Sequence, residues 1–139
     1  MTQSRLDKLT ASLRASGLSA VALTPGPTLT YLTGVAFHLM ERPVVLLVAP
    51  GSDPVLIMPE LELPKVDLFP YKVQAFAYGE NPTEWGNAFR KAAQSLGLDG
   101  KRIGVEPRQM RLLEFNYVKE GAPEAEYPDA SNVLAELRL

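Results

Sequence analysis

The chain has 139 residues, with 16 acidic and 14 basic side chains, one His and no Cys. This length suits one domain, which we take to span residues 1–139. The absence of Cys excludes a disulfide scaffold, a thiolate zinc site and a Cys nucleophile. A formal net charge of −2 gives no electrostatic reason to bind nucleic acid or an anionic membrane.

The sequence contains no apolar run near the roughly 20 residues that a membrane helix needs. The N-terminus has no apolar signal region after its first charge, so we expect a cytoplasmic protein. The 12 Pro residues are unevenly spread. Because Pro is excluded from helix interiors and central strands, the stretches between Pro residues are expected to hold the regular elements.

The first stretch predicts a helix, a strand and a short helical turn. Three leucines recur at i, i+3 and i+7 and form one apolar stripe: Leu6, Leu9 and Leu13. Gly17 suits the position after a helix end. A buried strand is predicted over residues 20–24 and a helical turn over residues 28–33, ended by Gly34.

The middle of the chain predicts a hairpin. Residues 44–49 are apolar throughout and rich in β-branched side chains, which is typical of a strand covered on both faces. Residues 50–53 (Pro-Gly-Ser-Asp) supply turn chemistry, and residues 55–58 return as a second strand.

The last third alternates strands and helices. A strand is predicted over residues 72–78, followed by a helix with Asn81 as cap and Pro82 in its first turn. A short strand covers residues 102–105. Two further helices are predicted, one opened by Pro107 and one starting near Asp129 or Ser131. The whole predicts a three-layer α/β/α domain around a mixed sheet of about five strands.

Most catalytic motifs are missing. The sequence has no dinucleotide fingerprint, no Walker A loop and no nucleophile elbow, and His38 is the only imidazole for a triad. Glu60 and Glu62 are close in sequence, but we expect both to be solvated on an irregular surface segment. A complete small hydrolase that uses surface carboxylates and a metal is the weakest of the alternatives.

Residues 37–42 (Phe-His-Leu-Met-Glu-Arg) are the most promising candidate site. They combine an imidazole, a carboxylate and a guanidinium, which together can hold a charged ligand: His38, Glu41 and Arg42. The alternative is an exposed loop with a local Glu41–Arg42 ion pair that contributes little.

Two short motifs, in order along the chain, resemble a known family. Tyr31-Leu-Thr-Gly34 is similar to a turn of the creatinase/prolidase N-terminal domain, and Ile103-Gly-Val-Glu106 is similar to a later segment of it. The hairpin, the strand that ends at Tyr78-Gly79 and the helix after Asn81-Pro82 stand between them in the family's order. The resemblance covers essentially the whole chain and implies a ribonuclease-H-like fold.

The resemblance implies a role in an Xaa-Pro peptidase. In that family a C-terminal pita-bread domain binds two divalent metal ions, and this chain has neither that domain nor its ligands. We therefore expect no catalytic, cofactor or metal residue here. We expect a homodimer in which His38, Glu41 and Arg42 contact a proline-containing peptide in the partner subunit.

The same resemblance assigns structural roles to Tyr31 and Gly34, and Glu106 is a possible cap of the helix after Pro107. Two other functions stay open at this point. One is a stand-alone interaction or self-association module. The other is the N-terminal domain of a creatinase-type amidinohydrolase.

Overall fold

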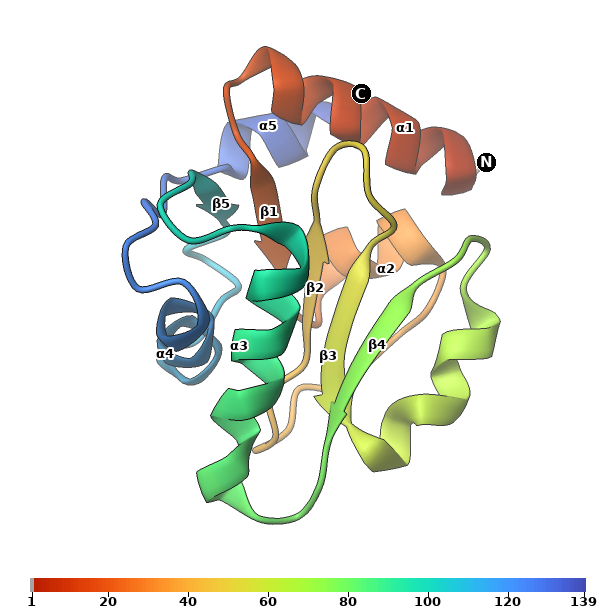
Figure 1. Ribbon diagram of the computed structural model, residues 1–139. Helices are drawn as coiled ribbons and strands as arrows, with labels where there is room; N and C mark the ends of the chain where they lie inside the picture. The colour runs from red at the N-terminus through yellow and green to blue at the C-terminus, as the bar shows by residue number, and fades with distance from the viewer. Residues whose placement is uncertain (1) are drawn as a thin grey trace.

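The structure, a computed structural model, describes residues 2–139. Five strands form one sheet in the order β4-β3-β2-β1-β5 (Figure 1). They are β1 (Ala20–Leu23), β2 (Val45–Val48), β3 (Val55–Pro59), β4 (Gln74–Tyr78) and β5 (Ile103–Val105). Strand β2 is antiparallel to both of its neighbours, whereas β1 and β5 are parallel, as are β3 and β4.

Helices cover both faces of this sheet. One face packs against α1 (Thr2–Ala15), α2 (Pro27–Thr33) and α5 (Ser131–Glu136), and the other against α3 (Trp85–Leu96) and α4 (Leu112–Gly121). Two 3₁₀ segments complete the described chain, η1 (Glu60–Leu68) and η2 (Pro82–Glu84). The expected three-layer α/β/α architecture is confirmed. The meander β1-β2-β3 with β5 parallel to β1 agrees with the ribonuclease-H-like fold that the resemblance implied.

Strand β2 shows why the central run is apolar at every position. Leu46 and Val48 point into the core beneath α1 and α2, and Val45 and Leu47 point into the core beneath α3. All four side chains are buried because both faces of the strand are covered. The leucine stripe of α1 is buried against the first of these cores, as its spacing predicted.

The predicted turns also form. Gly34 has a left-handed φ of 74° and its N–H donates to the carbonyl of Thr30 at 2.8 Å, which ends α2. The expected hairpin joins β2 to β3, with Leu47 opposite Val55. Asn81 caps its helix through Thr83, although the first turn is 3₁₀ rather than α. Within residues 2–139 no helix is long and apolar enough to cross a membrane.

Two local predictions were wrong. Pro107 does not open a helix: the backbone of residues 106–110 forms turns, and α4 begins only at Leu112 because Arg111 is extended, with ψ at 164°. Glu62 is not solvated. It is only 8% exposed and pairs with Lys65 at 3.5 Å, because η1 turns that side chain inward.

Chain direction brings several connections to one end of the sheet, which we call the carboxyl edge. Strands β1, β3, β4 and β5 all end there, and β2 begins there. In α/β sheets ligands bind at this edge, because the connections that follow the strands gather there. The segment between α2 and β2, which carries the three candidate residues, lies at this edge.

Candidate functional site

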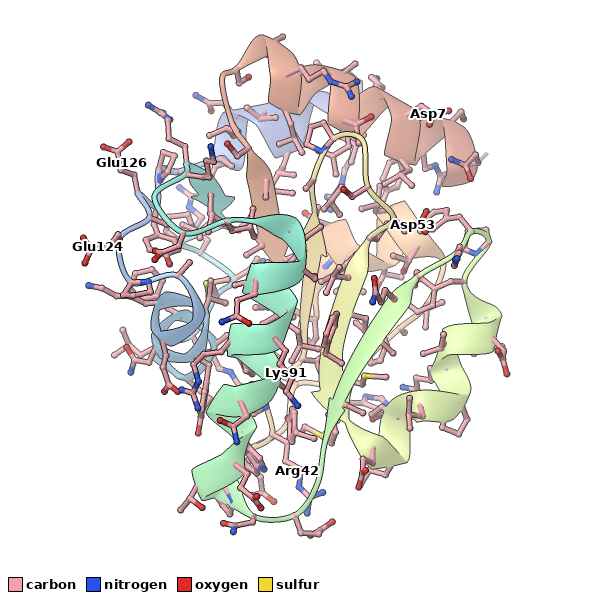
Figure 2. All side chains as sticks on the ribbon, in the orientation of Figure 1. Asp7, Arg42, Asp53, Lys91, Glu124 and Glu126 are labelled. Atoms are coloured by element: carbon pink, nitrogen blue, oxygen red, sulfur yellow. The ribbon has the colours of Figure 1, made fainter. Side chains whose placement is uncertain are left out.

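The candidate residues His38, Glu41 and Arg42 lie in one irregular connection, residues 35–43, which we call the edge loop. Figure 2 shows Arg42 near the bottom of the view, whereas Asp53, which belongs to the hairpin turn, lies well above it beside the start of β3. The edge loop has no helix or strand of its own. Its shape therefore depends on what other elements hold it.

The first part of the edge loop is anchored in the core. Val35 and Phe37 are buried, at 4% and 7% exposure. Lys65 of η1 donates to the carbonyl of Ala36 at 2.9 Å, and its ammonium lies 4.7 Å from the centre of the Phe37 ring. The buried carboxylate of Glu62 balances this ammonium. The segment before His38 is thus fixed by apolar burial and one charged donor.

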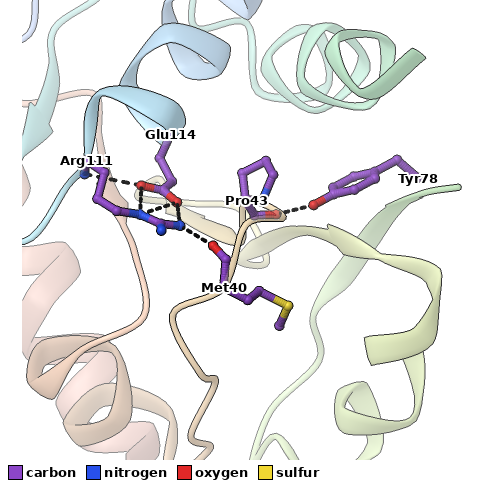
Figure 3. Close-up of polar contacts among 5 residues, drawn as sticks. All are labelled: Met40, Pro43, Tyr78, Arg111 and Glu114. Atoms are coloured by element: carbon purple, nitrogen blue, oxygen red, sulfur yellow. Dashed lines mark hydrogen bonds and ion pairs between the residues drawn. The ribbon is translucent and has the colours of Figure 1, made fainter. Parts of the chain in front are cut away.

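The middle of the edge loop is held from α4. Arg111 donates from Nη2 to the carbonyl of Met40 at 2.6 Å (Figure 3). The same guanidinium pairs with Glu114 through Nε, at 3.1 and 3.2 Å to the two carboxylate oxygens, and through Nη2. The Glu114 side chain is completely buried and also accepts from the backbone N–H of Arg111 at 3.2 Å. This hydrogen bonding raises the pKa of Arg111.

The last part of the edge loop is held from β4. The Tyr78 hydroxyl donates to the carbonyl of Pro43 at 2.5 Å, just before β2 begins (Figure 3). Tyr78 is buried at 4% exposure, and burial raises the pKa of its phenol well above the ordinary value. The phenol therefore stays protonated and remains a donor throughout the neutral range.

Arg42 is engaged, but not by its sequence neighbour. Its guanidinium makes a two-point ion pair with Glu80, at 3.0 and 2.7 Å, from the connection after β4. This hydrogen bond raises the pKa of Arg42. The simple alternative of a Glu41–Arg42 pair is therefore wrong, because the fold brings Glu80 closer to the guanidinium than the neighbouring residue.

His38 and Glu41 stay available. Both are exposed, and neither makes a hydrogen bond or ion pair with any residue in the described part of the chain. Leu39 between them is 55% exposed. The edge loop thus presents an imidazole, a leucine and a carboxylate on a fixed backbone. Such a set can bind a peptide with an apolar side chain and a charged end.

The described residues do not fit a metal ion. Within residues 2–139 no three His, Cys, Asp or Glu side chains lie close enough to hold one. Glu60 and Glu62, the closest acidic pair considered from the sequence, differ in environment, since Glu60 is exposed and Glu62 is buried beside Lys65.

Sequence reasoning missed the residues that hold the edge loop. Arg111 and Glu114 stand at i and i+3 at a helix start, a spacing that favours an ion pair and could have been noticed. Nothing local indicates that Arg111 reaches Met40, 71 positions away. Glu106 does not cap a helix with its side chain. Its carboxylate accepts from the Thr28 hydroxyl at 2.8 Å instead.

Comparison with known proteins gives one family match. The sequence model described as Creatinase/Prolidase N-terminal domain matches residues 5–139. No curated protein matches the sequence.

Several solved structures share the fold. A dipeptidase from Pyrococcus horikoshii is 27% identical, with a TM-score of 0.81 over 96% of this chain and 36% of its own. A prolidase from Thermococcus sibiricus has a TM-score of 0.83 at 21% identity, over 99% of this chain and 36% of its own. A proline dipeptidase from Streptococcus pneumoniae is 25% identical, with a TM-score of 0.78 over 96% of both chains. The present chain therefore spans about a third of the length of the first two relatives.

Proposed function

Because the chain belongs to the creatinase/prolidase N-terminal domain family, we propose that it is the non-catalytic N-terminal domain of a metal-dependent Xaa-Pro dipeptidase or aminopeptidase. The observation that carries this proposal is the family match over residues 5–139. Dipeptidases at 27% and 25% identity support it. The hydrolytic centre and its two metal ions would belong to a further domain, and this chain would catalyse no step.

In this proposal the edge loop acts on substrate in a homodimer. His38, Glu41 and Arg42 would face a proline-containing peptide bound by the partner subunit. Two features support a binding role. His38 and Glu41 are exposed and free to bind, and the backbone that carries them is already ordered by side-chain contacts. A pre-ordered loop loses little conformational freedom on binding, so more of its contact energy becomes affinity. A cytoplasmic location also remains part of the proposal.

The first test reads the gene beyond codon 139 and assays the protein encoded by the complete reading frame. We expect Asp, His and Glu metal ligands downstream and chelator-sensitive cleavage of Xaa-Pro dipeptides. A reading frame without such a domain would favour a stand-alone self-association module, and cleavage of creatine instead would favour the amidinohydrolase alternative.

The second test replaces His38 by Ala in that protein. We expect turnover of Xaa-Pro dipeptides to fall about tenfold, the effect of losing one hydrogen bond to a bound ligand, with unchanged unfolding. Asp53→Ala, in the exposed hairpin turn at the other end of the sheet, is the matched control. Unchanged kinetics of His38→Ala on several Xaa-Pro substrates would remove the edge loop from the active site.

A further inference from the structure

Arg111 makes two kinds of contact with one side chain. Its guanidinium neutralises a completely buried carboxylate, Glu114, and it also donates to the backbone of a distant loop at Met40. Only the carboxylate is buried, since the Arg111 side chain is 38% exposed. Neutralising Glu114 does not by itself require the contact with Met40, so that contact needs an explanation of its own.

Resting on the function proposed above, we infer that Arg111 is a positioning residue that sets the direction of His38 and Glu41 toward the substrate. Met40 stands between these two residues in the chain, and its carbonyl is the acceptor. A donor at that point fixes the peptide plane between Met40 and Glu41, which leads directly to Glu41 and lies two residues after His38. The backbone before His38 is held by Lys65 and the backbone after Arg42 by Tyr78, so Arg111 supplies the anchor in the middle.

The chemistry of the guanidinium suits this role. Its planar fork offers several donors in fixed directions, so Nη2 can serve Glu114 and Met40 together. The Arg111–Glu114 pair is neutral as a unit, so it holds the loop without adding net charge beside His38 and Glu41. A Lys at the same position keeps a positive charge for Glu114, but its shorter, compact ammonium does not span both acceptors.

This distinction gives a direct experiment on the 139-residue chain. We expect Arg111→Lys to preserve the cooperative unfolding transition while the NMR order parameters of the backbone amides of residues 38–42 fall from the rigid range, about 0.85, to below about 0.6. Arg90→Lys is the matched control, since Arg90 pairs with Glu120 between α3 and α4 and does not touch the edge loop. That variant should leave the order parameters of the loop unchanged.

A second variant covers the possibility that Arg111→Lys does not fold. The double variant Arg111→Met/Glu114→Met removes the guanidinium without leaving a buried charge unpaired. It should show the same local fall in the order parameters. Order parameters of amides 38–42 equal to those of the unchanged chain, in whichever of the two variants folds, overturn the inference.

Kinetics of the protein encoded by the complete reading frame separate this inference from the proposed function. We expect Arg111→Lys to raise KM about tenfold with little change in kcat, because a disordered loop weakens substrate and transition-state binding alike. If His38→Ala impairs turnover while Arg111→Lys does not, the positioning role is wrong and the proposed function stands. If neither variant changes kinetics, both are wrong.

Discussion

Strand β2 is entered and left by two very different connections. The edge loop before it (residues 35–43) contains no regular structure and is held by side chains from η1, α4 and β4. The hairpin turn after it (residues 50–53) is held by its own backbone, with Gly51 at a φ of 85° and the Ser52 N–H donating to Ala49 at 3.3 Å. The turn is held by contacts within itself, whereas the shape of the edge loop depends on side chains from other elements.

The hairpin turn and the edge loop illustrate two ways in which a protein fixes the shape of a connection. A turn made by local chemistry needs particular residue types at its own positions, such as Gly51 here. A loop fixed from outside keeps its own side chains free, and here those side chains are His38, Leu39 and Glu41. Binding residues are commonly found on loops that a rigid scaffold positions, and the edge loop has that construction.

The largest effect is expected where the edge loop depends on a buried charge. Arg111→Met leaves Glu114 buried without its partner, and we expect a loss of about 3 kcal/mol in the free energy of unfolding. Urea unfolding at neutral pH measures it. The double variant Arg111→Met/Glu114→Met should recover most of the loss. A single variant as stable as the unchanged chain would mean that Glu114 is not isolated from water.

The hairpin turn should respond to backbone strain alone. Gly51→Ala places a side chain at a left-handed φ, which costs about 1–2 kcal/mol. Space is not the cause, because an added Cβ would meet only Arg14 Nη2, at 3.8 Å. We expect lower thermal stability with unchanged NMR order parameters in the edge loop. Gly51→Asn, which tolerates this conformation better, should lose less.

Tyr78→Phe removes the anchor at Pro43 and keeps the ring. We expect about 1 kcal/mol of destabilisation at pH 7, from one buried hydrogen bond. Burial raises the pKa of Tyr78, so the folded chain holds the neutral phenol. The stability that the neutral Tyr78 phenol contributes is complete below its pKa in the unfolded chain, about 10, and is lost as the pH rises above that value.

The difference between the unchanged chain and Tyr78→Phe should therefore narrow above about pH 10 in urea titrations. Burial also raises the pKa of Tyr71 and of Tyr127 to about 12. The unchanged chain and Tyr78→Phe should therefore both lose stability above about pH 10. If the difference in the free energy of unfolding stays constant up to pH 12, the contribution of Tyr78 to stability does not depend on protonation of its phenol.

The smallest effect is expected at the exposed Arg42–Glu80 pair. Arg42→Gln should change the free energy of unfolding less than any variant above, because water and salt screen an exposed ion pair. Its effect should instead appear as lower NMR order parameters of the amides of residues 41 and 42. The difference from the unchanged chain should shrink as the salt concentration rises.

The two connections also differ in how far sequence predicts them. The hairpin turn, the left-handed Gly34 and the fully apolar β2 all follow from local composition, and all are confirmed. The start of α4 does not, because Pro107 is a good first residue for a helix and the extended Arg111 overrides it. The shape of the edge loop is harder still to predict from sequence, because its contact between Arg111 and Met40 joins residues 71 positions apart.

The candidate residues show the same limit. Composition pointed to His38, Glu41 and Arg42, and the fold places all three in one loop at the carboxyl edge. Their partners were not predictable, because Arg42 bonds with Glu80, a residue from another connection. Residue type indicates which side chains can bind, but only the fold determines which of them are already occupied.

The order of strands in the sheet has a consequence for how this chain acquires its fold. Strands β1, β2 and β3 are consecutive and antiparallel. The hairpin between β2 and β3 closes a short loop, and the connection between β1 and β2, residues 24–44, is still much shorter than the stretch between β1 and β5. Strand β5 must pair with β1 in parallel, Ile103 beside Ala20, and so waits for most of the chain to be synthesised and collapsed. We therefore expect the meander to form early and β5 to join late, which φ-values near 0 for Ile103 variants would reveal.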